Sequence, residues 1–168
     1  MVTRVGIIVD VDSLYKAARE KLDGAISYQA LLTNLVGRGQ NRRLIEAVAV
    51  FDPTANMRTA FVRALVAMGY SINHDLRRAT EDRVAHSMMR MAPSIDTLIL
   101  VTGSPIYLSI MEFLSETERD IGLEVAFFHD KTDKDLLHDC DEFVELDSSY
   151  VYAADVPERA VGRRSLRS

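Results

Sequence analysis

The chain has 168 residues, of which 48% are hydrophobic and 27% are charged, and its net charge is −5. This length and balance predict one compact domain with its own core and exclude a disordered chain. The single cysteine, Cys140, excludes an intramolecular disulfide framework and a cysteine-based zinc site.

Charge is unevenly distributed along the chain. Four of the 20 basic residues lie within 159–167, so residues 1–158 hold 16 basic and 25 acidic residues, a net charge of −9. Such a body is not the basic footprint typical of nucleic-acid binding. No apolar run approaches the ~20 residues of a membrane span, and the N-terminus lacks the pattern of a signal peptide. We therefore expect a cytoplasmic protein with no membrane partner.

Strand and helix patterns alternate along the chain. Short apolar, β-branched runs predict strands, and segments with apolar residues at helical spacing predict helices that end at glycine or proline. The expected strands are at 4–9, 43–51, 70–76 (near an edge), 97–102, 123–128 and 142–146; the expected helices are at 13–22, 27–36, 57–68, 81–92, 105–119 and 133–138.

This alternation predicts an α/β fold, with a mostly parallel central sheet of about five to six strands and helices on both faces. From Asp147 onward the pattern dissolves. We expect a single domain over residues 1–146 and a C-terminal tail over residues 147–168 that is basic at its end.

Polar residues follow most of the predicted strands, where ligands of open α/β sheets bind. They are Asp10, Asp12 and Ser13 after the first strand, Asp52 after the second, Gly103 and Ser104 after the fourth, and His129 and Asp130 after the fifth. The pair Asp10 and Asp12 is the clearest indication of a site, because hard divalent cations prefer carboxylate oxygens. Asp12 or Ser13 has the alternative role of helix cap, whereas Asp10 lies where no cap is expected.

Several nucleotide and hydrolase motifs are absent from these strand ends. No glycine follows the first strand closely, which excludes a dinucleotide fingerprint and a P-loop at that turn. The turn at Ser104 lacks the second glycine of a nucleophile elbow, which argues against serine hydrolysis. Ser104 followed by proline is a favoured helix start, and the same turn has the alternative role of binding a phosphate through its backbone amides.

The chain resembles the NYN domain, a branch of the PIN-like metal-dependent nucleases, over roughly residues 4–146. The segments that carry the resemblance are IIVDVDSLY, ISYQALLTNL, AVAVFDP, FVRALVAMGYSI, DTLILVTGSPIYLSIMEFL, GLEVAFF and LLHDCDEFVEL. In that family the first strand ends in Asp-x-x-Asn, and here Asp10 matches the aspartate while Ser13 replaces the asparagine. The helix after the third strand offers Glu81 or Asp82 for the next acid.

The fourth strand of the family ends in Ser-Gly-Asp-x-Asp-Phe, and this chain departs from that pattern. Gly103 and an aromatic residue, Tyr107, are kept, but Ser104 and Ile106 stand where both carboxylates would be. The resemblance therefore implies a three-layer PIN-like domain with an incomplete acidic site.

The residues that the resemblance assigns to the site are Asp10 and Asp82 as catalytic and metal-binding residues, and Ser13, Gly103 and Ser104 as binding residues. An active site would take Mg²⁺ or Mn²⁺; a retired site would take no cofactor. His86 shares a helix face with Asp82 and could join it. Further carboxylates that could reach the site are Asp12, Asp52, Asp130 and Asp141, and arginines that could contact phosphates are Arg42, Arg43, Arg77, Arg78, Arg83 and Arg90.

Three functions stay open. The first is a catalytically impaired nuclease homologue that binds RNA or another nucleic acid, or acts as a scaffold through self-association into a homo-oligomer. The second is a divergent Mg²⁺- or Mn²⁺-dependent ribonuclease that uses Asp10, Asp82 and a substitute ligand. The third is a protein-interaction module with no nucleic-acid role. The fold alone does not choose between them.

Overall fold

A computed structural model describes residues 1–52, 59–73, 79–117 and 120–152. Six strands in these residues form one sheet in the order β3-β2-β1-β4-β5-β6, and every neighbouring pair is parallel. Their bounds are β1 Thr3–Asp10, β2 Arg42–Val50, β3 Tyr70–Ile72, β4 Thr97–Val101, β5 Gly122–Phe127 and β6 Glu142–Glu145. The predicted α/β fold with a parallel sheet is confirmed, and β3 lies at an edge as its short alternating pattern indicated.

Helices connect these strands in crossovers. The α-helices are α1 Val11–Lys21, α2 Tyr28–Gly37, α3 Thr59–Ala67, α4 Thr80–Met91, α5 Leu108–Thr117 and α6 Lys134–Asp139. Short 3-10 turns are η1 Ala92–Ser94, η2 Pro105–Tyr107, η3 His129–Lys131 and η4 Ser148–Tyr150. The structure describes no helix that is both long enough and apolar enough to cross a membrane.

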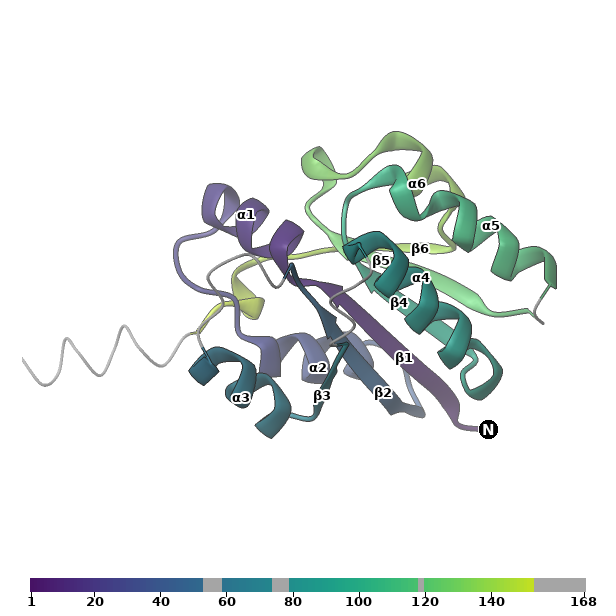
Figure 1. Cartoon of the computed structure of the whole chain (residues 1–168), viewed down its shortest axis with the longest axis horizontal. Coiled ribbons are helices and arrows are strands. Elements are labelled where there is room, and N and C mark those ends of the chain that lie inside the picture. Colours follow the sequence, from purple (N-terminus) through teal and green to yellow (C-terminus); the bar gives the residue numbers. More distant parts are fainter. Residues whose placement is uncertain (53–58, 74–78, 118–119, 153–168) are drawn as a thin grey trace, which may run out of the picture.

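The sheet is the middle of three layers (Figure 1). One apolar cluster joins α1, α2 and α3 to one face of the sheet, and a second joins α4, α5 and α6 to the other face. Successive residues of β1 alternate between the two clusters, with Ile7 and Val9 in the first and Ile8 in the second. Each such fully buried side chain contributes about 1.5–3 kcal/mol, so β1 is held firmly from both sides.

Helix α4 packs unusually close to β1. A Cβ atom added at Gly6 would collide with the Met91 side chain. Glycine at this position lets the last turn of α4, at Met91, pack closely against the backbone of β1.

The chain continues past residue 146 as packed structure. Tyr150 is buried, Val151 forms an antiparallel bridge with Ile26, and the Tyr152 amide donates to the Ala25 carbonyl at 3.1 Å. The segment 147–152 therefore belongs to the body of the domain, although its mixed polar and aromatic residues have no strand or helix period. Residues 153–168, the rest of the expected tail, lie outside the described part of the chain.

Candidate functional site

The Asp10 side chain lies at the carboxyl end of β1, in the middle of the sheet between β2 and β4. Helix α1 begins at the next residue, and Asp10 is its N-cap, accepting a hydrogen bond from the Ser13 amide at 3.4 Å. The expectation that no cap is needed at Asp10 is wrong, because no loop separates the strand from the helix. Asp10 is also only 4% exposed.

Three hydroxyl groups donate to one oxygen of this carboxylate. Asp10 Oδ2 accepts from Ser13 Oγ at 2.8 Å, from Tyr107 Oη at 3.1 Å and from Thr102 Oγ1 at 3.3 Å. A carboxylate has about four lone-pair sites on its two oxygens. With the Ser13 amide on Oδ1, the protein itself supplies four donors, so Asp10 is a satisfied, buried hydrogen-bond acceptor.

The Tyr107 hydroxyl stays protonated in this setting. Burial of the ring raises the pKa of Tyr107 far above its ordinary value, and the negative charge of Asp10 and the hydrogen bond to it raise the pKa further. The phenol is therefore a protonated hydrogen-bond donor to Asp10. The sequence identified Tyr107 as the aromatic residue that matches the family motif. It did not predict the hydrogen bond from the Tyr107 hydroxyl to Asp10.

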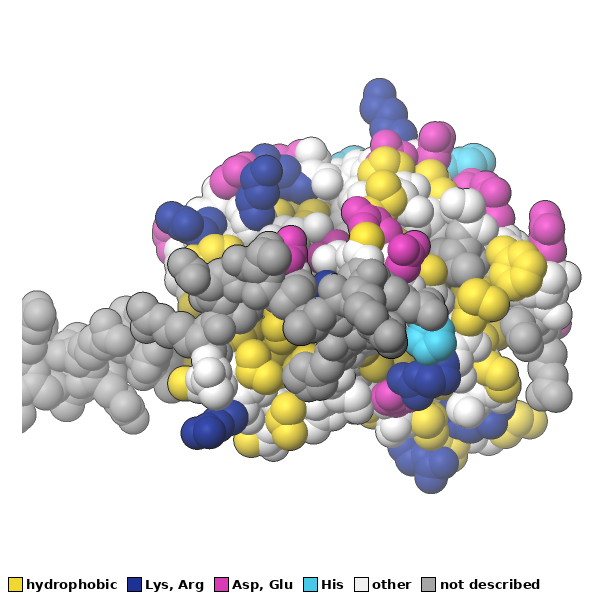
Figure 2. Space-filling view, viewed as in Figure 1, with side chains coloured by type: hydrophobic (Ala, Val, Ile, Leu, Met, Phe, Trp, Pro, Cys, Tyr) yellow, Lys and Arg dark blue, Asp and Glu magenta, His cyan; other side chains and the backbone are white. Residues whose placement is uncertain are grey.

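Other carboxylates surround Asp10 on the solvent side. The Asp12 carboxylate accepts from the Asp52 amide at 2.6 Å. Partial burial raises the pKa of Asp12, the Asp52 amide lowers it, the charges of Asp10 and Asp52 raise it, and the charge of Arg83 lowers it. The charge of Glu81 also acts on Tyr107. Figure 2 shows acidic side chains gathered near the centre of this face, where α1 and α4 begin in Figure 1.

The guanidinium of Arg83 lies beneath this acidic edge and is 2% exposed. It donates to the Phe51 carbonyl at 2.7 Å, to the Asn73 carbonyl at 3.2 Å and to Thr80 Oγ1 at 3.2 Å. Arg83 thus ties the segments that follow β2 and β3 to the first turn of α4. The sequence suggested a phosphate contact for this residue; its burial shows a structural cation instead.

The turn after β4 uses its own polar groups. Ser104 Oγ accepts from the Ile106 amide at 3.4 Å as the N-cap of η2, and the Ser104 amide donates to Thr102 Oγ1 at 3.3 Å. The helix start predicted at Ser104 is confirmed. A Cβ atom at Gly103 would collide with the Phe127 ring and with the Lys131 carbonyl, so close packing against the segment after β5 requires glycine there.

The other predicted acids are spread over the molecule. Asp82 and His86 lie exposed on α4, with Asp82 in its first turn. Asp130 pairs with Lys21. Asp141 precedes β6 and accepts from the Leu123 amide at 2.6 Å, at the opposite edge of the sheet.

These residues do not fit a metal centre of the kind that the PIN-like resemblance implies. Within the described ranges, no group of three or more His, Cys, Asp and Glu side chains is arranged to hold a metal ion. Asp10 is turned toward protein hydroxyls, Ser104 caps a helix, and Ile106 is apolar and exposed. Of the five residues assigned to the site, the structure brings Asp10 and Ser13 into direct contact and joins Ser104 to them through Thr102.

Three of the six arginines considered as phosphate contacts, Arg42, Arg83 and Arg90, are already bound to protein groups. Arg42 Nη2 donates to both carboxylate oxygens of Glu124 at 3.1 Å in a buried ion pair, and Arg90 makes an exposed bidentate ion pair with Glu46. Arg77 and Arg78 lie outside the described residues. For Arg42, Arg83 or Arg90 to bind a phosphate, its existing ion pair or hydrogen bonds would have to break.

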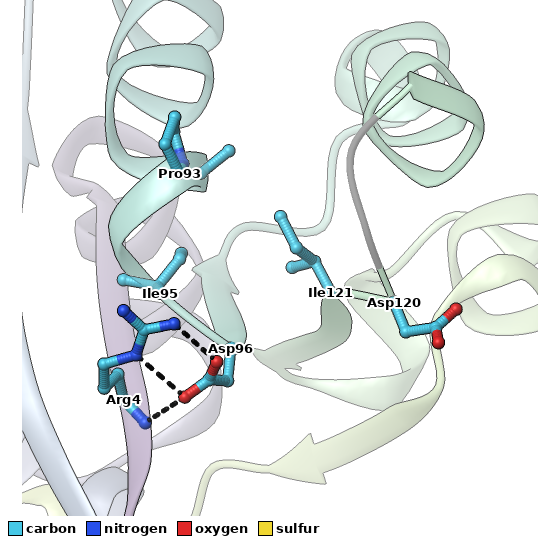
Figure 3. Close-up of a pocket in the computed structure, with 7 residues that line it drawn as sticks. Arg4, Pro93, Ile95, Asp96, Asp120 and Ile121 are labelled. Atoms are coloured by element: carbon cyan, nitrogen blue, oxygen red, sulfur yellow. Dashed lines mark hydrogen bonds and ion pairs between the residues drawn. The ribbon is translucent and has the colours of Figure 1, made fainter.

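A small hollow at the amino-terminal edge of the sheet is lined in part by Arg4 and Asp96, which form a bidentate ion pair across it (Figure 3). Its volume of about 40 Å³ suits roughly one water molecule. It lies away from the carboxyl ends of the strands, where Asp10 is found.

Comparison with known proteins agrees with this architecture. The family model for the NYN domain matches residues 4–147. A crystal structure of a protein of unknown function, VPA0982 from Vibrio parahaemolyticus, superposes with a TM-score of 0.74 at 19% identity, covering 89% of this chain and 96% of that one. No curated protein matches the chain. The match over nearly the whole body confirms the resemblance and the single PIN-like fold.

Proposed function

Since the chain belongs to the NYN domain family, a PIN-like nuclease family, we propose that it is a catalytically impaired member that binds single-stranded RNA without cleaving it. The observation that carries the proposal is the state of Asp10: three protein hydroxyl groups occupy one oxygen of its carboxylate. In a nuclease that oxygen would have to be available to a metal ion.

The chemistry of phosphodiester cleavage explains why this matters. A metal-dependent nuclease needs a cation to polarise the phosphate and to generate hydroxide from water. A ligand set for that cation would need Asp10 to give up donors and would need acids at Ser104 and Ile106. Removal of single preorganised groups typically lowers rates tens- to a thousand-fold, so loss of both acids leaves little activity.

RNA binding is supported by the family, and the negative charge of the body restricts phosphate contacts to local basic surfaces away from the acidic edge of Asp12, Asp52 and Glu81. Helix α1, which starts at this edge, carries exposed Tyr15, Lys16 and Arg19. These are the residue types that contact single-stranded RNA.

The decisive experiment combines cleavage and binding. Purified protein is incubated with end-labelled single-stranded RNA and Mn²⁺ or Mg²⁺, with EDTA and the Asp10→Asn variant as controls and an active metal-dependent ribonuclease in parallel. Fluorescence anisotropy on the same RNA measures affinity. We expect saturable binding and intact RNA in both metals.

Two alternatives correspond to other outcomes. Cleavage that both EDTA and Asp10→Asn abolish would establish an active ribonuclease and make Asp10 and Asp82 its proposed metal ligands. Absence of RNA binding, together with concentration-dependent association in analytical ultracentrifugation, would establish a protein scaffold or interaction module.

A further inference from the structure

Helices α4 and α5 expose large apolar side chains on one side of the molecule. The two helices lie side by side in the same layer (Figure 1), and their inner residues, such as Met88 and Met111, belong to one buried cluster. On the outer side, Met89 of α4 is 48% exposed, Phe113 of α5 is 46% exposed and Ile106, in the turn before α5, is 49% exposed. Figure 2 shows hydrophobic side chains at the surface over α5. Removing such side chains from water would favour contact with a partner.

The flank of these helices beside β2 is basic. Arg90, in the last turn of α4, donates to the two carboxylate oxygens of Glu46 on β2 at 2.6 and 3.0 Å, so its guanidinium lies on the side of α4 that faces β2. Arg43 is exposed near the start of β2. The next residue, Leu44, packs on the cluster of α1, α2 and α3, so Arg43 lies on the α4 side of the sheet. Among the described residues, no ion pair involves Arg43.

The outer surface of α5 is acidic. Glu112 and Glu116 lie one helical turn apart and are both exposed, with Phe113 between them. Neither glutamate forms an ion pair within the part of the chain that the structure describes. Like charges four residues apart on a helix repel each other, and cations from a partner would relieve that repulsion. Basic groups therefore lie on the β2 side of the exposed apolar residues, and acidic groups lie on α5.

The direction of the two helices places the charges of opposite sign at the same level. Each helix runs from the carboxyl edge of the parallel sheet back to its amino edge, so α4 and α5 point the same way. Arg90 and Glu116 both lie in the last turn of their helices. At the other end, the acidic first turn of α4 lies level with uncharged residues at the start of α5, Ile106 and Ser109.

We propose that a second copy of this chain binds to this surface and forms a symmetric homodimer. The surface, called here the α4–α5 face, consists of Arg43, Met89, Arg90, Ile106, Glu112, Phe113 and Glu116. A two-fold axis that runs between the two helices, along their length, places α4 of one copy over α5 of the other. Met89 then meets Phe113 of the second copy, and the arginines of one copy lie opposite the glutamates of the other. The symmetry repeats each contact, so one self-complementary face is sufficient.

The size of the α4–α5 face indicates a weak dimer. Helices of 12 and 10 residues are about 18 Å and about 15 Å long, and packed helices lie about 8–10 Å apart. Such a face is smaller than the about 800 Å² per partner of a standard interface. We therefore expect monomers and dimers in exchange, with the dimer favoured at high protein concentration.

The first test is sedimentation equilibrium of the full chain at concentrations from about 1 μM to about 1 mM. The variants are Met89→Ala and Phe113→Ala, with Tyr15→Ala as the matched control, because Tyr15 is an exposed aromatic residue on α1 in the opposite layer. We expect Phe113→Ala and Met89→Ala each to weaken dimerisation by about tenfold or more, since a symmetric dimer loses each contact twice. Tyr15→Ala is expected to dimerise like the parent protein. Thermal melting verifies that each variant is folded.

A charge exchange tests the arrangement of the two copies. Glu116→Arg alone and Arg43→Glu alone each place like charges opposite one another twice, so each variant is expected to remain monomeric where the parent protein dimerises. An equimolar mixture of the two variants forms a heterodimer in which one contact is native and the other is reversed in both partners. We expect the mixture to recover dimerisation. Asp23→Arg, which makes the same change in net charge at an exposed position between α1 and α2, is the control.

Three results would each overturn the proposed dimer. The first is a parent protein that stays monomeric over the whole concentration range. The second is a Phe113→Ala variant that dimerises as tightly as the parent protein, because the dimer would then use another surface. The third is a mixture of the two charge variants that stays monomeric, because the arginines and glutamates would then not face each other. RNA binding is measured separately by anisotropy, so the dimer and the proposed function are tested independently.

Discussion

Removing the charge of Asp10 is expected to destabilise the protein. In the Asp10→Asn variant one oxygen remains for the hydroxyl donors, but those bonds lose the carboxylate charge, and the amide nitrogen no longer accepts from Ser13. Hydrogen bonds to charged groups contribute about 1.5–3 kcal/mol and neutral ones about 0.5–1.5 kcal/mol. We expect a loss of about 1–2 kcal/mol in the free energy of unfolding.

Asp10→Ala should cost more, because it removes every acceptor. The buried hydroxyls of Tyr107 and Thr102 would each lack this partner, at about 1–3 kcal/mol apiece, and loss of the α1 cap adds about 1 kcal/mol. Relief of repulsion with Asp12 offsets part of this, so we expect a net loss of about 3–5 kcal/mol.

Urea unfolding followed by circular dichroism measures both losses from the midpoints at constant slope. The same measurement tests the reading of the site. A carboxylate that serves metal binding is repelled by the neighbouring acids when no metal is bound. Replacing it therefore commonly raises the stability of the folded protein. A stability gain in Asp10→Asn, measured without added metal, would therefore refute the structural role of Asp10.

Three further perturbations test neighbouring groups. Tyr107→Phe removes one donor to Asp10 and should cost about 1–2 kcal/mol in urea unfolding, without altering RNA affinity; an unchanged midpoint would show that the bond contributes nothing. Arg83→Met should cost about 2–4 kcal/mol, because the Phe51 and Asn73 carbonyls lose this donor. Arg90→Met, which breaks an exposed ion pair, should cost under about 1 kcal/mol; equal losses would contradict the structural role of Arg83. The raised pKa of Asp12 means that the folded state binds its proton more tightly than the unfolded state, so stability falls as pH rises above the unfolded pKa of about 3.9. Asp12→Asn should thus raise the melting temperature at about pH 7 and leave it unchanged at about pH 3, and an equal rise at both pH values would exclude ionisation as the cause.

The order of strands and helices was predictable because buried parallel strands read as short apolar runs. Gly69 and the alternating pattern after it predicted the short strand β3 near an edge. Element boundaries agreed to within a few residues wherever the structure describes them. The packing of residues 147–152 was not predictable, because it depends on one isolated β-bridge at Val151 and one buried ring at Tyr150. Neither produces a periodic pattern in the sequence.

The site was predictable only in its position. That Asp10 ends a central strand follows from the apolar run before it. The hydrogen bonds of Asp10 do not follow from the local sequence, because their donors Thr102 and Tyr107 are 92 and 97 residues away along the chain. Arg83 misled sequence reasoning for the same reason: an arginine on an amphipathic helix looks like a surface residue until the helix packs over the segments that bind its guanidinium.

The departures from the family pattern are physically linked. The resemblance places asparagine at Ser13 and phenylalanine at Tyr107, and both positions here carry a hydroxyl that donates to Asp10 Oδ2. It places carboxylates at Ser104 and Ile106, and both are gone. A buried carboxylate without a metal ion is costly unless hydrogen bonds compensate it. Here the hydroxyls of Ser13 and Tyr107 provide that compensation, and they tie the end of β1 to the start of α1 and to the turn after β4.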